Sequence, residues 1–325
     1  MGNTITGRFA PTGSDTFTAL GSAGGYTSPQ FQIALSGTQG INVAGAARST
    51  TALDVTFDNL VVEADGILDL GLLNIATRMR VQTGENVLIG GFIINGTDPK
   101  RVIIRGIGPS LSSFFSGTLA NPTLELFQGT NLLQSNNDWK DTQRTEIEAT
   151  GLQPGNDFES AIVRTLPPGA YTAVLRGLGD TTGIAVVEAY DLNQAANSRL
   201  ANIATRGFVE AGDNVMIGGL IIGPAGGGCA TLVVRALGPS LTAFGIAGAL
   251  QDPTLDLVNA DGMIIRSNNG WRDSQATEIM ATGLQPSDDR EAALIEMPAP
   301  GSYTAIVRGV GNSTGVGLVE VYHLQ

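Results

Sequence analysis

Two glutamates stand at matching places in the sequence, each within a segment that is otherwise apolar. Glu188 lies in the run GIAVVEAY and Glu320 lies in the run GVGLVEVY. A carboxylate in such surroundings could act as a general acid or base. Glycoside hydrolysis normally requires two carboxylates, however, and each segment offers only one. We therefore expect a structural role for both glutamates.

Two arginines at equally matched positions are the expected partners of these glutamates. Arg105 ends the run VIIR and Arg235 ends the run LVVR. A partly buried charge is tolerated when it is paired with an opposite charge. The sequence thus predicts one structural ion pair in each copy of the motif. These pairs are Arg105–Glu188 and Arg235–Glu320, with Arg176 and Arg308 as alternative partners.

A polar loop at residues 135–141 suggests a different chemistry. It reads SNNDWKD, and its carboxylate and amide oxygens are the ligands that calcium prefers, with Asp138 and Asp141 as candidates. In the second copy of the loop Gly270 replaces Asp138, and the spacing matches no known calcium motif. The competing interpretation is a loop of Asx-turns in which Trp139 covers an edge of the core. We expect no bound metal and no cofactor.

The chain has a single cysteine, Cys229, and a single histidine, His323. One cysteine can form neither an intramolecular disulfide nor a cysteine zinc cluster. Catalysis by a Ser-His-Asp or Cys-His set would have to use His323. The Gly-Lys-Ser/Thr signature of a phosphate loop does not occur. These observations argue against an enzyme.

The charge balance narrows the range of partners. The chain carries 30 acidic against 18 basic side chains, for a net charge of −12. Nucleic acids and anionic membrane surfaces both attract basic patches, so neither is an expected partner. No apolar run is long enough to span a bilayer, which predicts no membrane insertion.

Internal repetition organises most of the chain. Residues 86–94, NVLIGGFII, return as NVMIGGLII at 214–222, and the decapeptide TEIEATGLQP returns as TEIMATGLQP. One copy spans residues 72–192 and the other spans residues 200–325. The polar joint between them is short, so we expect two domains that sit end to end with restricted motion.

Within each copy, apolar residues alternate with period two in short runs bounded by Gly, Pro, Asn and Asp. Ile184, Val186 and Glu188 would share one face of such a strand. The pattern predicts an all-β fold of tandem β-sandwich modules, jelly-roll or immunoglobulin-like. Residues 141–150 break the alternation. With Asp141 as N-cap and Gly151 as C-cap, they predict one short helix per module.

Residues 1–71 differ in composition and form a smaller N-terminal β segment rich in Gly, Ser and Thr. Two alternating runs in it predict strands with one apolar face each. Such a face needs a cover, either within the same chain or on the sheet of another subunit, and the sequence leaves both open. The candidate assembly residues are Phe31, Ile33, Leu35, Leu53, Val55 and Phe57.

The motifs NIATR, NVLIGGFII, IRGIGPSL and PPGAYTAVLRG resemble a module found, often in tandem, in large exported proteins of Verrucomicrobia-like environmental bacteria. The second half of the module is similar to pre-peptidase C-terminal domains, which are β-sandwiches. The resemblance covers both repeats and leaves residues 1–71 unmatched. It implies surface display, adhesion or assembly, and it supplies no catalytic residues.

These expectations favour an extracellular or cell-surface structural subunit of bacterial origin. We expect it to self-assemble through β-sheet contacts into a filament or surface layer, with a strand from residues 1–71 donated to the next subunit. A head-to-tail contact of this kind does not close on itself and yields a filament. The alternative is a surface adhesion or glycan-binding tandem module, with glycans or a cell surface as partner.

Overall fold

The computed structural model describes residues 71–223 and 231–324, together with four short strands in the preceding segment. The chain divides into two compact units, Met1–Ala64 and Asp65–Gln325. In the first unit, β1 (Gly7–Phe9) pairs with β2 (Thr18–Leu20), and β3 (Ile33–Ala34) pairs with β4 (Asn42–Val43). Among the predicted assembly residues, Ile33 falls in β3. The others lie outside the described residues: Phe31, Leu35, Leu53, Val55 and Phe57.

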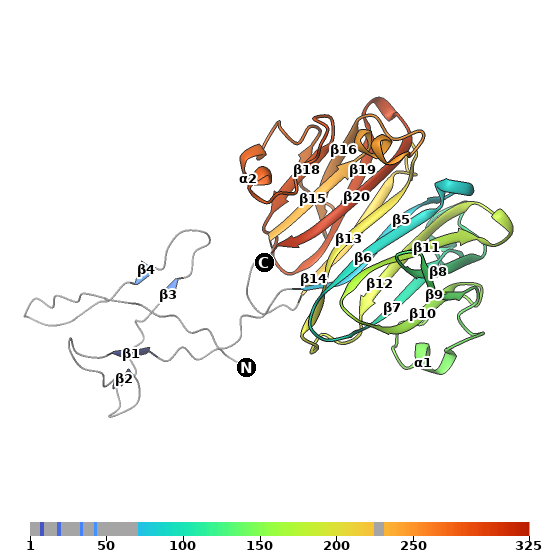
Figure 1. The fold of residues 1–325 in the computed structure, drawn as a ribbon, viewed down its shortest axis with the longest axis horizontal. Helices are drawn as coiled ribbons and strands as arrows, with labels where there is room; N and C mark the ends of the chain where they lie inside the picture. Colours follow the sequence, from blue (N-terminus) through green and yellow to red (C-terminus); the bar gives the residue numbers. More distant parts are fainter. Residues whose placement is uncertain are drawn as a thin grey trace, which may run out of the picture. The chain divides into compact units, whose positions relative to one another are not determined.

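The second unit is built almost entirely of antiparallel strands, which confirms the predicted all-β fold class (Figure 1). The strands of the first repeat are β5 (Gly71–Val81), β6 (Leu88–Gly96), β7 (Lys100–Ile107), β8 (Pro122–Gln128), β9 (Asn131–Asn136), β10 (Ser160–Leu166), β11 (Gly169–Gly177) and β12 (Gly183–Asp191). Those of the second repeat are β13 (Ser198–Val209), β14 (Met216–Gly223), β15 (Thr231–Leu237), β16 (Pro253–Asn259), β17 (Ile264–Asn268), β18 (Ala292–Glu296), β19 (Gly301–Gly309) and β20 (Gly315–Leu324).

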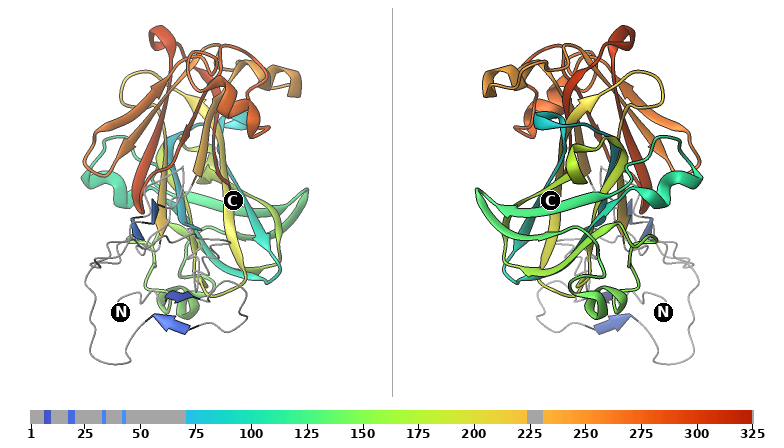
Figure 2. Two further views of the ribbon diagram at one scale, coloured as in Figure 1. Left: turned by 90° about the vertical axis from the view of Figure 1, so that its left-hand side faces the viewer. Right: turned by 90° about the vertical axis from the view of Figure 1, so that its right-hand side faces the viewer.

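Both repeats pair their strands in the same order. In the first repeat one layer runs β9-β8-β11-β6 and the other runs β10-β7-β12-β5. The second repeat matches it with β17-β16-β19-β14 and β18-β15-β20-β13. Figure 2 shows the packed sheets from two sides. Equal order in the two copies follows from their equal hydrophobic alternation, which determines the buried face of each strand.

The short linker predicted two domains placed end to end, and this prediction is wrong. Instead, β6 pairs with β13 and β14 pairs with β5, so each layer continues from one repeat into the other. The linker between β12 and β13 is short because the two repeats lie side by side. This junction of four strands, β5, β6, β13 and β14, is called the seam below.

Equivalent residues of the two repeats meet along the seam, which gives it an approximate twofold symmetry. Leu72 pairs with Leu200 in the β5–β13 contact. The hydroxyls of Thr77 and Thr205, buried and 128 residues apart in sequence, hydrogen-bond over 2.7 Å. Further along, Gln82 Nε2 donates to Glu210 Oε1 over 2.9 Å. A contact between equivalent residues is what a symmetric dimer of one repeat would show.

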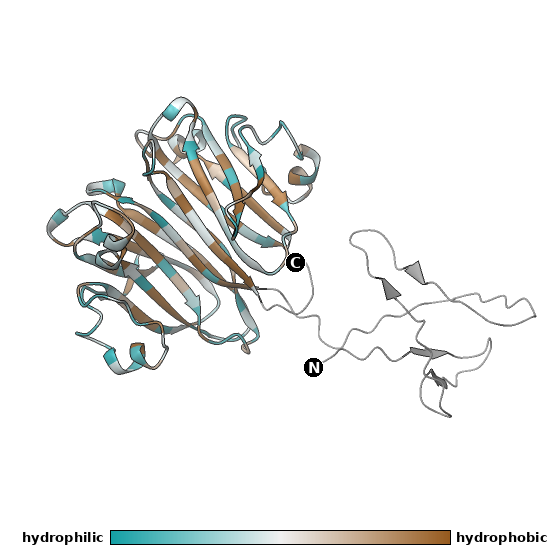
Figure 3. Ribbon diagram, turned by 180° about the vertical axis from the view of Figure 1, so that it is seen from behind, coloured by the Kyte–Doolittle hydropathy of each residue, from teal (hydrophilic) through white to brown (hydrophobic). Residues whose placement is uncertain are grey.

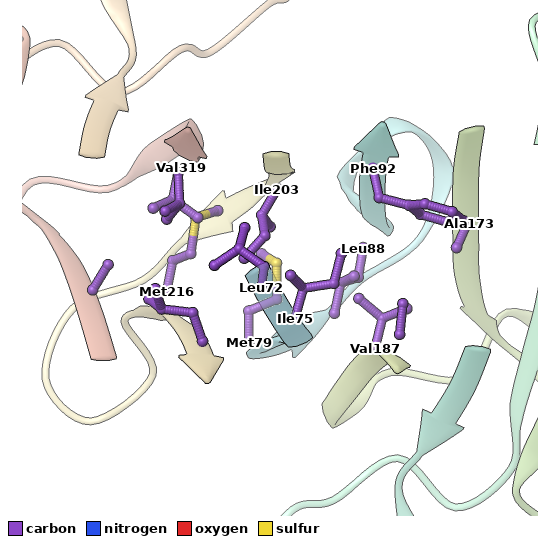
Figure 4. Packing of buried hydrophobic residues seen from close by; sticks show 14 of the residues in the cluster. Leu72, Ile75, Met79, Leu88, Phe92, Ala173, Val187, Ile203, Met216 and Val319 are labelled. Atoms are coloured by element: carbon purple, nitrogen blue, oxygen red, sulfur yellow. The ribbon is translucent and has the colours of Figure 1, made fainter. Parts of the chain in front are cut away.

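One hydrophobic core crosses the seam. Side chains of both repeats pack between the layers there, including Leu72, Met79 and Phe92 from the first and Ile203 and Met216 from the second (Figure 4). Figure 3 shows apolar residues concentrated on the strands and polar ones in the loops. Burial of this shared core is the main favourable term in folding, so the repeats stabilise each other.

Each repeat contains one short helix and several turns of 3₁₀ helix. The helices are α1 (Arg144–Glu148) and α2 (Ala276–Ala281); the 3₁₀ turns are η1 (Gly84–Asn86), η2 (Pro109–Ser113), η3 (Leu178–Asp180), η4 (Pro239–Phe244) and η5 (Val310–Asn312). The predicted helix is present, but its N-cap is Gln143 in the left-handed conformation and not Asp141. No helix in the described part of the chain could cross a membrane.

Candidate functional site

Arg105 and Glu188 are directly opposed residues of β7 and β12. The Nε of Arg105 donates to Glu188 Oε2 over 2.9 Å, its Nη2 bonds the same oxygen, and its Nη1 donates to the Leu152 carbonyl over 2.8 Å. The guanidinium carbon lies 5.1 Å from the centre of the Tyr190 ring. The cross-strand register thus creates the predicted ion pair, and the tyrosine and loop carbonyl complete its partners.

The second repeat reproduces this arrangement with Arg235, Glu320, Leu284 and Tyr322. The Nε of Arg235 donates to Glu320 Oε2 over 2.8 Å and its Nη1 to the Leu284 carbonyl over 2.8 Å. Burial raises the pKa of the Tyr322 phenol, and the nearby Glu320 carboxylate raises it further. The alternative arginines pair elsewhere: Arg176 with Glu125, and Arg308 with Asp256.

The polar loop that follows β9 covers the outer edge of β10. Asn136 Oδ1 accepts the Ala161 N–H over 2.9 Å. The Gln143 side chain accepts the Val163 N–H over 3.2 Å and donates to the Val163 carbonyl over 2.7 Å. Because β10 is the last strand of its layer, these two amide side chains occupy the place of a neighbouring strand and block the edge.

The same cap protects β18 in the second repeat. Asn268 Oδ1 accepts the Ala293 N–H over 2.9 Å, and the Gln275 amide exchanges two hydrogen bonds with the backbone of Ile295. Gln275 has a φ of 55°, a left-handed conformation that is costly for glutamine. The two backbone bonds compensate that strain. Sequence reasoning missed both glutamines, although their recurrence in the two loops was the available signal.

The calcium candidates Asp138 and Asp141 lie in the first of these loops. The Asp141 N–H donates to the Asp138 carbonyl over 3.0 Å. Burial raises the pKa of the Asp138 carboxyl, and the charges of Asp141 and Asp157 add to the rise. Within the described ranges, no three side chains of His, Cys, Asp or Glu gather so as to hold a metal. The role that the loop does show is to cap β10.

Trp139 covers the outer face of β7 and β10, as the loop interpretation predicted. Its side chain packs with Ile103, Ile147, Ala161 and Val163 in a small separate cluster, and the residue is 4% exposed. Trp271 packs with Ile279 and Ala293 in the equivalent cluster of the second repeat. The loops therefore carry secondary cores that hold the edge caps in position.

The remaining two edges, β9 and β17, expose apolar side chains. In β17, Ile264 is 60% and Ile265 is 41% exposed, and the preceding Met263 is 61% exposed. A register shift in the β16–β17 pairing marks a bulge, which turns two successive isoleucines outward. In β9, Leu132 is 48% exposed at the matching position beside an equivalent bulge. Arg266 is neutralised by Glu296 of the other layer.

In each repeat a buried glutamate binds the turn that follows β7 or β15, the strands that carry Arg105 and Arg235. Sequence reasoning missed these glutamates too. Glu159 Oε1 accepts the N–H groups of Gly108 and Ser110, at the start of η2. Glu291 does the same for Gly238 and Ser240 at the start of η4. Both glutamates are fully buried. The recurrence of a glutamate directly before β10 and before β18, 51 and 53 residues after the glycine of the GPSL motif, was the signal in the sequence.

An open groove of about 600 Å³ lies over the seam on the outer face of β6, β13, β20 and β15. Its floor includes the small residues Gly91 and Ala204, one from each repeat. Arg206 and the Arg235–Glu320 ion pair are among its polar lining residues. Its walls are η4 and residues 285–287. The groove thus offers a ligand an apolar wall, a floor of small residues and several polar groups.

His323 lies near the end of β20, outside this groove. Burial lowers the pKa of its imidazole, and the charge of Arg199 lowers it further. Its Nδ1 has no hydrogen-bond partner among the described residues. Cys229 lies outside the described residues.

Comparison with known proteins assigns no family to the chain. No family model matches it, and no curated protein matches it. Among solved structures it is similar to the STIV MCP, with 12% identity over 79% of this chain and 95% of that chain and a TM-score of 0.21. It is also similar to a DUF4785 family protein from Legionella pneumophila, with 8% identity over 84% and 87% and a TM-score of 0.24. Such low scores carry no argument about function.

Proposed function

We propose that this chain is an extracellular structural subunit that assembles with copies of itself through the ends of its β-sandwich. One observation carries the proposal: β10 and β18 are capped by amide side chains, whereas β9 and β17 expose apolar side chains. Proteins protect the sheet edges that must not pair. The edges without the asparagine and glutamine cap, β9 and β17, are therefore the surfaces that we propose for contact.

A second copy of the chain is the occupant that suits these edges. The equivalent strands β9 and β17 are the edges of different layers, β9 at the outer end of the first repeat and β17 at the outer end of the second. A contact between β17 of one copy and β9 of the next leaves one edge free on each copy, so it propagates into a filament or layer. These strands have six and five residues and are bulged, so burial of Ile264, Ile265 and Leu132 supplies more of the contact than backbone bonding does.

Secretion, cell-surface location and bacterial origin belong to the same proposal and rest on the composition and the resemblance of the repeats. A strand donated by residues 1–71 to the next copy is also part of the proposal, as a second route to the same assembly. The proposal assigns no catalytic reaction to the chain.

Light scattering after gel filtration and negative-stain imaging of the purified chain at neutral pH test the proposal. We expect polymers, and we expect Ile264→Asp to convert them into smaller species because a charge would be buried in the contact. Met280→Asp is the matched control, since Met280 is 46% exposed and belongs to α2, outside β17.

Two results would change the proposal. A wild-type chain that stays monomeric at high concentration contradicts self-assembly. Polymers that survive Ile264→Asp but disappear on deletion of residues 1–50 would replace the edge contact with the donated strand.

A further inference from the structure

The groove lies over β6 and β13, and the equivalent face of the molecule is that of β14 and β5. The two faces differ at the residue that follows an exposed phenylalanine. In the first repeat Phe115 follows Phe114, and its ring stacks on Arg78, with 4.3 Å between the guanidinium carbon and the ring centre. In the second repeat Gly245 follows Phe244. Arg206, the counterpart of Arg78, lines the groove and has a distant contact of 3.9 Å with exposed Glu85.

The buried glutamates Glu159 and Glu291 also differ, because fewer hydrogen bonds satisfy the carboxylate of the second repeat. Both oxygens of Glu159 are bonded, because Oε2 accepts from Ser110 Oγ and from the Asn156 N–H. In the second repeat Ser240 Oγ bonds Oε1 of Glu291, and Oε2 has no partner among the described residues. Glu291 is fully buried and belongs to the groove lining. An unpaired buried carboxylate oxygen is costly, so it calls for a donor.

We propose that this second-repeat groove binds a neutral saccharide chain. Phe244 is 82% exposed and, with Leu241 and Ile246, gives an apolar wall on which the C–H face of a sugar ring can pack. Sugar hydroxyls both donate and accept hydrogen bonds, which suits the free oxygen of Glu291 and the guanidinium of Arg206. Few polar groups set in an apolar recess are the usual composition of a ligand site.

The charge of the groove favours a neutral ligand. Arg235 and Glu320 neutralise each other in their ion pair. The remaining charges are the guanidinium of Arg206 and the carboxylate of Glu291, which are opposite in sign. A sialylated or uronic-acid chain would bring a negative charge that has no additional cation to meet in this lining.

The floor of the groove disfavours a peptide as ligand. Peptides that recognise sheets add a strand to a free edge, where backbone groups are unpaired. Here β6 and β13 form the floor and pair with each other from Ser198–Gly96 to Arg206–Ile89. Their backbone groups are therefore used, and side chains alone remain to make contacts.

The test is a printed array of neutral, sialylated and uronic-acid oligosaccharides probed with the intact chain, followed by calorimetry with the neutral oligosaccharide that binds best. We expect Phe244→Ala and Arg206→Ala each to weaken that affinity at least tenfold. Phe114→Ala is the matched control, because Phe114 is 77% exposed at the equivalent place in the first repeat. Both phenylalanines are exposed, so their removal leaves the fold intact.

Binding to neutral oligosaccharides that Phe244→Ala and Arg206→Ala weaken and Phe114→Ala leaves unchanged supports the site. The proposal is overturned by an array with no neutral ligand, by preferential binding to acidic chains, or by equal losses in the control variant. Tighter binding to a peptide array of the same density would overturn it as well. The Ile264→Asp variant should bind the saccharide as well as the wild-type chain, which separates this site from assembly.

Discussion

The Arg235–Glu320 pair depends on its burial in a way that surface pairs do not. The side chains of Arg235 and Glu320 are 14% and 10% exposed, and the guanidinium also bonds a loop carbonyl and contacts a tyrosine ring. When one partner of such a pair is removed, the other charge stays desolvated without compensation. By contrast, Arg308–Asp256 in the same repeat is a more exposed pair, with side chains 44% and 22% exposed.

Glu320→Gln should lower the free energy of unfolding by about 3 kcal/mol, because Arg235 is left buried with a neutral partner. Asp256→Asn should change it by less than about 1 kcal/mol, because this pair is more exposed and the amide oxygen can still accept from the Ser267 hydroxyl. Urea unfolding followed by circular dichroism measures both. Equal effects of the two substitutions would show that the buried pair contributes no more than a surface pair.

At the scale of elements, the edge strands divide into two types. On β10 and β18 the side chains of an asparagine and a glutamine bond the outward backbone groups, and each glutamine holds a left-handed conformation to do so. The loop sequence that suggested a calcium site therefore has a structural use. Amide side chains give the edge strand the donor and acceptor that it would otherwise seek in another chain.

Gln275→Asn should remove the cap on β18 while keeping a residue that tolerates the left-handed conformation. The shorter amide cannot reach Ile295, so the Ile295 N–H should exchange with solvent about tenfold faster, which corresponds to about 1.4 kcal/mol. Hydrogen exchange followed by mass spectrometry measures this, with Gln153→Asn at an exposed site as control. Unchanged protection of Ile295 would mean that the cap does not determine the stability of this edge.

At the scale of the molecule, sequence reasoning succeeded where the determining contacts lie within one repeat. Period-two alternation predicted the strands, and the opposition of Arg105 and Glu188 followed from adjacent strands whose charged residues face the same way. The seam could not be predicted, because Gly91 and Ala204 carry no signal that they adjoin across repeats. The groove depends on the seam, so it was missed too, as was the unpaired oxygen of Glu291.

The seam also contains a contact between unlike residues, Gln82 and Glu210, which distinguishes one repeat from the other. Along its approximate twofold axis equivalent residues meet, and some of them differ. Gln82 donates to Glu210, and Met79 fills the space that a side chain on Gly207 would need. A dimer of the first repeat alone would place Gln82 against Gln82, which can hydrogen-bond. A dimer of the second repeat alone would place Glu210 against Glu210, and two nearby carboxylates repel each other. The mixed pair therefore favours assembly of the two different repeats within one chain.

We expect residues 197–325, expressed alone, to form a weak dimer at neutral pH in which β13 and β14 of each copy rebuild the seam. Glu210→Gln should strengthen that dimer at least tenfold by removing the carboxylate repulsion. Residues 71–192 should not rebuild the seam, because Met79 would meet Met79 where Gly207 now leaves it room. Sedimentation equilibrium measures the association of both pieces. A second repeat that is a folded monomer with or without Glu210→Gln would show that the seam is not self-complementary.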